Sequence, residues 1–315
     1  MNLQQLIERY VCHRQSLGEK FQTNGYILRA FGRAIGGEAD VADVRAEQVN
    51  AFLAGSGPLT RTWHGKYHAL LAFYRYAISR GHVTSAPLPT VVPKRPPPFV
   101  PYIYTPEELR RLLRATDSYQ RAPGRVEPVT MRTLVLLLYG TGLRLSEALA
   151  LDRPDVDLEN HLLTVRQTKF YKSRLVPFSP QLGHALAQYV SGRPVPPRPA
   201  EAPAPFFTTR TGARLKQATV QNRFRCLRTH AGIGRTGGAR CQPRLHDLRH
   251  TFAVHRLTSW YRQGADVQRL LPLLSVYLGH VHLGATQVYL SMTPELLAEA
   301  NACFAHYAGK EERHD

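Results

Sequence analysis

Three short segments in the second half of the chain carry arginine, histidine and tyrosine side chains that could act on a phosphate. In the first, GTGLRLSEAL, the glycines at 140 and 142 favour a sharp turn that would place Arg144 at the start of a helix. A guanidinium there adds its planar donors to the positive end of the helix, which suits an anionic oxygen. Taken alone, the segment is as typical of an ordinary surface arginine.

The second segment, LHDLRHTFA, places His246 and Arg249 three residues apart. On a helix these two side chains would share a face and offer a phosphate one proton donor and one fixed cation. His246 and His250 are also four residues apart, a spacing that can bind zinc. The central glutamate of the H-E-x-x-H motif is missing, however, so we expect no metal. A histidine at a helix N-terminus can also have a hydrogen-bonding role alone.

The third segment, YLGHVHLGATQVYL, places His280 and Tyr289 nine residues apart, with a glycine turn and a short helix expected between them. The chain has 15 tyrosines, and a tyrosine is often a partly buried core residue, so Tyr289 is not singled out by its type. His282 has no evident role, and we expect it to be exposed.

The order G-T-G-L-R-L-S-E, H-x-L-R-H-T and L-G-H followed nine residues later by tyrosine resembles the signature of the tyrosine recombinases of the phage-integrase and Xer type. The resemblance covers most of residues 102–292. It implies that four side chains bind and activate the scissile phosphate of DNA and that a fifth, a tyrosine, is the nucleophile. In this sequence the four are Arg144, His246, Arg249 and His280, and the nucleophile is Tyr289.

A lysine completes the set that the resemblance implies. The segment T-K-F-Y-K-S-R-L-V-P-F is similar to the family's G-K-G-x-K-x-R-x-V-P. On that alignment Lys169 is the catalytic lysine and Lys172 is not, although Thr168 stands where the family usually has glycine. The implied reaction yields a 3′-phosphotyrosyl protein and a free 5′-hydroxyl, with Lys169 protonating the departing oxygen. It needs no cofactor and no metal.

The chain divides at a proline-rich stretch, residues 86–101, which holds seven prolines and is typical of a semi-rigid linker. Residues 1–85 look all-helical. Basic side chains, His64 among them, fall between the members of an apolar seam, which are Trp63, Tyr67, Leu70, Leu71, Tyr74, Ala77 and Ile78. Such a helix could face solvent or bind DNA. Residues 1–85 as a whole resemble the family's core-binding, DNA-binding domain. Residues 102–315 would form the catalytic domain with a C-terminal helix.

The larger piece is predicted to be mainly α with a small antiparallel β-sheet. Thr105 and Glu108 form a capping-box pattern, and residues 131–151 suggest a buried helix, a glycine break and a second helix. Residues 161–179 predict a β-hairpin with its turn at 169–173. The segment 255–277 is about two helical turns longer than is usual in the family. We expect it on the surface, and it suggests an integrase of a mobile element.

Composition agrees with a nucleic-acid partner. The 41 Lys and Arg residues outnumber 23 Asp and Glu, which gives a formal charge of +18. Such a surplus favours double-stranded DNA, although an anionic membrane surface or a merely basic protein would also fit. No apolar run is long enough to span a bilayer, so no membrane role is expected. Four scattered cysteines suggest reduced thiols, and we expect a cytoplasmic, nucleoid-associated protein.

The leading hypothesis is a site-specific DNA recombinase or integrase that exchanges strands between two duplexes. The family resemblance implies a homotetramer on two DNA sites, possible accessory proteins, and a C-terminal helix (294–310) that docks either on its own domain or on a neighbour. One alternative is strand cleavage and rejoining as in a type IB topoisomerase or telomere resolvase. Another is a DNA-binding protein without catalysis. The target sequence and the choice between integration and excision stay open.

Overall fold

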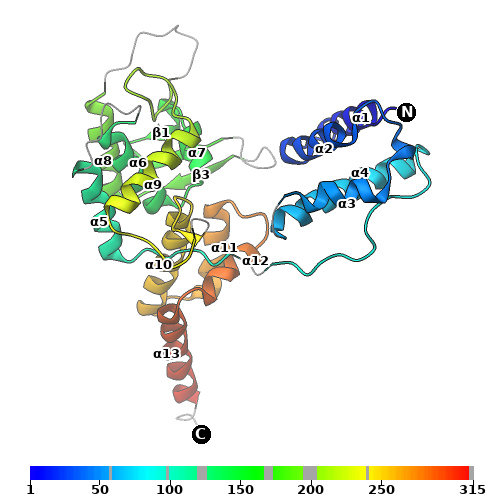
Figure 1. Cartoon of the computed structure of the whole chain (residues 1–315). Helices are drawn as coiled ribbons and strands as arrows, with labels where there is room; N and C mark the ends of the chain where they lie inside the picture. Colours follow the sequence, from blue (N-terminus) through cyan, green and yellow to red (C-terminus); the bar gives the residue numbers. More distant parts are fainter. Residues whose placement is uncertain are drawn as a thin grey trace. The chain divides into compact units, whose positions relative to one another are not determined.

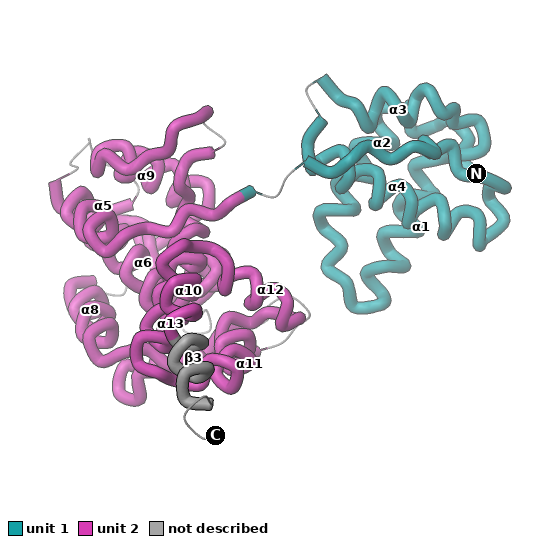
Figure 2. The backbone as a smooth tube through the Cα atoms, turned by 90° about the horizontal axis from the view of Figure 1, so that it is seen from below, with its two compact units in different colours: residues 1–99 teal, residues 100–315 magenta. Residues whose placement is uncertain are grey.

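The computed structural model describes residues 1–56, 59–96, 99–118, 126–166, 173–193, 204–238 and 241–311, with side chains described as far as residue 302. The chain forms two compact units, residues 1–99 and 100–315 (Figure 2). The division falls within the proline-rich stretch. Among the described helices, none combines the length and the apolar composition needed to cross a membrane.

The first unit is helical (Figure 1). Its elements are α1 (Leu3–Ser16), α2 (Gln22–Ile35), the 3-10 turn η1 (Val41–Asp43), α3 (Ala46–Ala54) and α4 (Arg61–Ser79). The seam of α4 differs in detail from the prediction, because Phe73 is fully buried whereas Ile78 is exposed. His64, expected among the basic side chains outside the seam, is also buried.

The second unit is mainly helical with one small sheet, as predicted (Figure 1). Its helices are α5 (Pro106–Ser118), α6 (Pro128–Thr141), α7 (Leu145–Ala150), α8 (Pro180–Ser191), α9 (Gln217–His230), α10 (Asp247–Arg262), α11 (Val267–Leu278), α12 (Gly284–Gln287) and α13 (Pro294–Glu311), with 3-10 turns η2 (Arg153–Asp155) and η5 (Val288–Ser291). The predicted capping box opens α5, since Thr105 and Glu108 each accept a hydrogen bond from the other's backbone N–H.

The sheet contains three antiparallel strands in the order β1 (Val156–Asp157), β2 (Leu162–Val165) and β3 (Arg174–Pro177). The predicted hairpin is β2 and β3, in which Leu163 pairs with Val176 and both are buried. Strand β1 was not predicted, because two residues are too few to show a periodic pattern. Residues 167–172, which include Lys169 and Lys172, lie outside the described residues.

The glycine break between α6 and α7 depends on one glycine rather than two. Gly140 is helical, within α6, whereas Gly142 adopts φ +63° and ends that helix. A Cβ at Gly142 would lie 2.6 Å from Cδ1 of Phe252, so α6 ends close against α10. This contact places the start of α7 beside the helix that carries the second motif.

The long segment 255–277 lies at the surface on one face only, since Leu273 and Val276 are exposed, and its other face is buried, which the prediction did not include. It forms the second half of α10 and most of α11, and Leu257, Leu271 and Leu274 are buried in a core cluster with Tyr289. The apolar residues of this segment therefore pack against the segment that carries the third motif. The start of α13 rests on its own domain, because Leu296 is buried in the same cluster and Arg262 of α10 forms ion pairs with Glu295 and Glu299.

Candidate active site

Arg144 is the N-cap residue of α7, directly after the Gly142 turn. Its side chain is 34% exposed, which makes it more accessible than Arg174 and Arg249. Its Nη1 donates to Oε1 of Glu147 at 2.7 Å, and its Nη2 donates to the carbonyl oxygen of Gly279 at 3.2 Å. The guanidinium is thus held on one side by protein and open on the other.

Glu147 is a buried carboxylate shared by two arginines. Arg174 of β3 donates to both of its oxygens, at 3.2 Å and 2.9 Å, and Arg144 binds the first oxygen as well. Burial alone would raise the pKa of Glu147, but the hydrogen bonds and positive charges of Arg174 and Arg144 lower it to about 2. The carboxylate therefore stays ionised near neutral pH and fixes both guanidinium groups.

Arg249 lies on the first turn of α10 and is 2% exposed. Its Nη1 donates to the carbonyl oxygen of Gly142 at 2.7 Å, and its Nη2 to that of Leu278 at 2.8 Å. Burial and the neighbouring charge of Arg144 lower the pKa of Arg249 to about 10. The side chain is therefore still protonated at neutral pH, and the negative charge of Glu147 offsets part of the effect of Arg144 on its pKa.

Three guanidinium groups meet at the C-terminal end of α11. Its last carbonyl oxygens, those of residues 277–279, accept hydrogen bonds from Arg174, Arg249 and Arg144 respectively, at 2.9, 2.8 and 3.2 Å. These carbonyls have no partner within the helix, and the C-terminal end of a helix attracts positive charge. The helix end thus gathers three cations from β3, α10 and α7, and His280 follows it directly in the chain.

The third motif folds back onto this cluster. Nδ1 of His280 lies 2.7 Å from the hydroxyl oxygen of Thr286, which is fully buried. Tyr289, on η5, is 2% exposed, and its ring stacks on that of His280 with centroids 6.0 Å apart. Burial raises the pKa of Tyr289, although the positive charge of Arg249 acts in the opposite direction. Burial and the charge of Arg249 lower the pKa of His280 to about 4.

His246 is the N-cap residue of α10 and is exposed, next to the buried Arg249. Desolvation of its ring and the charge of Arg249 lower its pKa. Its ring lies 4.9 Å from that of His250, edge to face, and the ring of His250 lies 5.6 Å from that of Tyr289. Within the described residues, no set of three or more potential metal ligands includes this histidine pair.

The structure therefore brings five of the six predicted residues into one cluster, and Lys169 lies outside the described residues. Four neighbours of these residues were not predicted: Glu147, Arg174, Thr286 and His250. The sequence held a signal for each, because all four stand inside the three motifs or the lysine segment. What it lacked was the direction in which their side chains point.

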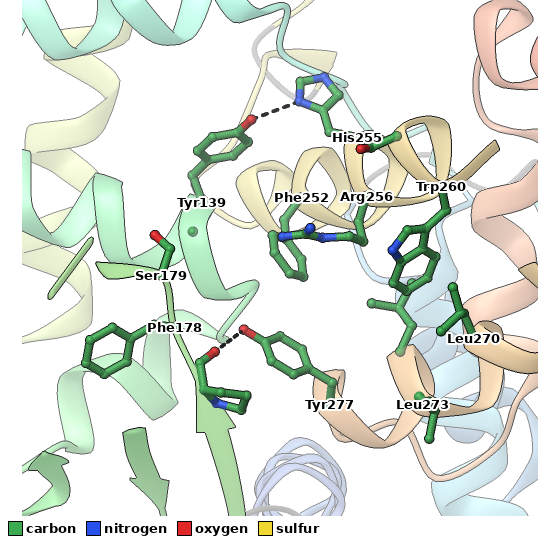
Figure 3. A pocket seen from close by; sticks show the side chains of 14 residues that line it. Tyr139, Phe178, Ser179, Phe252, His255, Arg256, Trp260, Leu270, Leu273 and Tyr277 are labelled. Atoms are coloured by element: carbon green, nitrogen blue, oxygen red, sulfur yellow. Dashed lines mark hydrogen bonds between the residues drawn. The ribbon is translucent and has the colours of Figure 1, made fainter. Parts of the chain in front are cut away.

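A separate cavity of about 710 Å³ lies between α6, α10, α11 and the end of β3. Figure 3 shows its mostly apolar wall, with the Tyr139 hydroxyl bonded to Nδ1 of His255 at 3.0 Å and the Tyr277 hydroxyl donating to the Pro177 carbonyl oxygen at 2.9 Å. None of the six predicted residues lines it, so it is distinct from the candidate site.

The second unit thus combines a mainly helical fold with a cluster of arginine, histidine and tyrosine side chains. The phage integrase family matches residues 103–295. The chain is 36% identical to the candidate integrase/recombinase y4rB of Sinorhizobium fredii, over 94% of this chain and 95% of the relative. It is 31% identical to the tyrosine recombinase XerC of Chlorobaculum parvum, over 82% of this chain and 77% of the relative.

Solved structures share the fold. The Tn1549 transposon integrase in complex with transposon right-end DNA superposes with a TM-score of 0.70 at 19% identity, covering 98% of this chain and all of that one (100%). A lambda integrase dimer bound to a COC′ core site superposes with a TM-score of 0.63 at 19% identity, covering 93% of this chain and 97% of that one. The chain belongs to the phage integrase family. It is a tyrosine-type site-specific recombinase, and neither the topoisomerase-like nor the inactive alternative is favoured.

Proposed function

We propose that Tyr289 attacks a DNA phosphodiester in line and forms a 3′-phosphotyrosyl bond while the 5′-oxygen departs. The observation that carries this proposal is the gathering of Arg144, Arg249 and His280 around the end of α11, next to the phenol of Tyr289. A second attack, by a 5′-hydroxyl of another strand, would reverse the step and exchange the strands. Because one phosphodiester replaces another, no external energy source is needed.

The arginines supply the electrostatic part of this reaction. The transition state gathers negative charge on the non-bridging oxygens, and fixed cations in a site of low water content stabilise it strongly. Arg249 is buried and binds backbone oxygens, and Arg144 is partly open to solvent. We assign Arg249 to the inner and Arg144 to the outer side of the bound phosphate.

The histidines act as neutral hydrogen-bond donors in this proposal. With a pKa of about 4, His280 is uncharged near neutral pH in the DNA-free protein. If the hydroxyl of Thr286 donates to Nδ1, the remaining proton of His280 sits on Nε2 and can be donated to a phosphate oxygen. His246, exposed at the start of α10, would donate to the same phosphate from the other side.

Tyr289 must lose a proton as it attacks. Burial raises its pKa, so it is neutral at pH 7, and the charge of Arg249 offsets part of the cost of ionisation. Because Tyr289 is almost completely buried without DNA, we expect η5 to shift toward the phosphate when DNA binds. Lys169 would protonate the departing 5′-oxygen, since an alkoxide is a poor leaving group.

The remaining assignments follow from the same reaction. Joining four strands requires four tyrosines, so we propose a homotetramer on two double-stranded DNA sites. We assign residues 1–85 to a core-binding domain, joined by the linker 86–101 to the catalytic domain 102–315. The DNA-bound transposon integrase and the lambda integrase dimer on its core site, which share this fold, support DNA as the partner, and the first also supports a mobile element as the source of the DNA. Affinity for DNA should fall steeply with salt.

Covalent trapping tests the proposal. The protein is incubated with nicked duplexes drawn from DNA that flanks its own gene, and denaturing gels then separate protein–DNA adducts. Tyr289→Phe removes only the phenolic hydroxyl and is the matched variant. We expect an adduct with the wild type and none with the variant, while both bind the duplex equally.

Three other outcomes would contradict the proposal. An adduct with both proteins would place the nucleophile at a different residue. Tight binding without an adduct from either protein would favour a DNA-binding protein without catalysis. Relaxation of supercoiled plasmids that lack a specific site would point to a topoisomerase-like enzyme instead.

A further inference from the structure

Two arginines, Arg144 and Arg174, bind the carboxylate of Glu147, and Arg174 is the more deeply buried of the two. It stands at the start of β3, and its side chain is 11% exposed. All three guanidinium nitrogens are bonded within the protein: Nε donates to the carbonyl oxygen of Tyr277, and Nη1 and Nη2 donate to the two oxygens of Glu147. With its donors directed inward, Arg174 is poorly placed to bind a phosphate itself.

The guanidinium of Arg174 also lies against the turn that leads to His280. A Cβ at Gly279 would lie 2.8 Å from Nη1 and 2.9 Å from Cζ of Arg174, and Gly279 has a left-handed φ of +69°. Only a residue without a side chain allows this close approach. The turn before His280 is therefore packed directly on Arg174, and the carbonyl of the same glycine accepts from Arg144.

These contacts make Arg174 the point at which three segments are fixed relative to each other. Through Glu147 it determines where the guanidinium of Arg144 lies, because the same carboxylate oxygen accepts from both arginines. Through residues 277–279 it fixes the end of α11, from which His280 extends. Its own strand, β3, leads directly from residues 167–172, the segment that contains Lys169.

We propose that Arg174 is a positioning residue that, through Glu147 and the end of α11, holds Arg144 and His280 in the geometry for binding the scissile phosphate. This inference rests on the proposed function. The positioning role of Arg174 differs from a general contribution to stability in one measurable respect. Loss of Arg174 should impair the stabilisation of charge on the phosphate, whereas DNA binding and the attack by Tyr289 on a less charged phosphate should be largely spared.

A pair of suicide substrates separates these possibilities. One nicked duplex carries the normal phosphodiester, and the other carries a methylphosphonate at the scissile position, in which a neutral methyl group replaces one non-bridging oxygen. The transition state on the second substrate has one negative charge less to stabilise. A variant with a misplaced arginine should therefore lose less activity on the methylphosphonate, whereas a generally damaged protein should lose the same factor on both.

The variants are Arg174→Ala and Arg174→Lys, compared with Arg144→Ala. Lysine keeps the charge, but its single ammonium group cannot bind both oxygens of Glu147 and the Tyr277 carbonyl in one plane. The matched control is Arg214→Ala. Arg214 likewise binds a carboxylate, that of Asp152, and a backbone carbonyl, that of Leu149, but it lies outside the site.

We expect both Arg174 variants to form adduct on the phosphodiester about 10–100-fold more slowly than the wild type. The defect should be much smaller on the methylphosphonate, as for Arg144→Ala, and the Arg214 variant should show no difference between the substrates. Equal defects of the Arg174 variants on both substrates would overturn the inference, as would wild-type rates for Arg174→Lys. If Arg174→Ala does not fold, Arg174→Lys alone tests the inference, by its defect on the phosphodiester relative to its defect on the methylphosphonate.

This experiment distinguishes a failure of the function proposed for Tyr289 from a failure of the positioning role proposed for Arg174. Absence of an adduct from the wild type on either substrate would overturn the function proposed for Tyr289, and the inference with it. A wild-type adduct combined with equal defects in the Arg174 variants would leave the proposed function standing and remove only the positioning role.

Discussion

The buried guanidinium of Arg249 donates a hydrogen bond of 2.7 Å to the carbonyl oxygen of Gly142, 107 residues earlier in the chain. This bond joins the helix of the second motif to the turn that presents the first. Because Gly142 immediately precedes the segment that ends in Arg144, the two arginines cannot move independently of each other. The distance between the two cations of the proposed site is set by the packing of α6 against α10.

Arg249→Lys should abolish most of the cleavage activity while the protein still binds DNA. A lysine keeps the charge, but one ammonium group cannot bind the carbonyls of Gly142 and Leu278 and a phosphate in the planar arrangement of a guanidinium. We expect adduct formation to slow by about 10²–10³-fold, the usual loss when one transition-state donor is removed. Single-turnover trapping measures this rate, and duplex affinity within a few-fold of wild type is the control. Cleavage close to the wild-type rate would contradict the inner position proposed for Arg249.

Gly142→Ala should destabilise the second unit and weaken cleavage together. The left-handed φ of +63° costs an alanine energy, and its Cβ would lie 2.6 Å from Phe252 and 2.8 Å from Leu278. We expect a loss of about 2–5 kcal/mol from strain and overpacking combined. Gly264→Ala is the matched control, since Gly264 has a φ of +64° and no atom within 4 Å of such a Cβ.

The control isolates the backbone contribution. Gly264→Ala should cost about 1–2 kcal/mol, which is the strain alone. Denaturant unfolding of both variants gives the two values, and their difference is the energy of the close contact between α6 and α10. Equal losses would mean that the packing beside Gly142 adjusts freely and does not hold the arginines together.

Thr286→Val should slow cleavage without removing any charged group. Valine has the shape of threonine but cannot donate to Nδ1 of His280, so the neutral imidazole is free to carry its proton on either nitrogen. Loss of one hydrogen bond of about 0.5–1.5 kcal/mol should slow adduct formation by roughly 2–10-fold. Thr286→Ser, which keeps the hydroxyl, should react faster than the valine variant. If serine and valine are equally slow, the effect comes from packing and not from the orientation of His280.

Acid should destabilise the DNA-free protein between pH 6.5 and 4. The pKa values of His280 and His250 are each lowered from 6.5 to about 4, first by burial and then by neighbouring positive groups. In this window the unfolded chain binds protons that the folded chain does not, so stability falls as the pH falls, by at most about 1.4 kcal/mol per pH unit for each group. Glu147, with a pKa of about 2, stays ionised in this window.

A single variant tests the histidine contribution. His250→Phe keeps a ring of similar size between His246 and Tyr289 but cannot be protonated. Thermal melting followed from pH 7 to pH 4 should show a shallower decrease for the variant than for the wild type. Parallel curves would show that His250 is not kept neutral by the fold.

The helices and strands around the site could be predicted from the sequence because the patterns that indicate them are local. The capping box at Thr105, the glycine that ends α6 and the alternating apolar residues of β2 and β3 each depend on neighbours in the chain. The surface position expected for residues 255–277 holds for one face of the segment only, because length relative to a family says nothing about which side chains are buried. Leu257, Leu271 and Leu274 share one buried cluster with Tyr289 of η5, an association between segments that no local pattern contains.

By itself the sequence determined which residue types are available and in what order. It determined the mainly helical class, the hairpin, the family and the six residues proposed for catalysis, of which Lys169 remains outside the described residues. Only the tertiary structure decided which donors face which acceptors. The gathering of Arg144, Arg174 and Arg249 on three successive carbonyls at the end of α11 joins segments that lie 29 to 135 residues apart in the chain. Such a meeting depends on the packing of helices, and packing is a property of surfaces rather than of spacing along the chain.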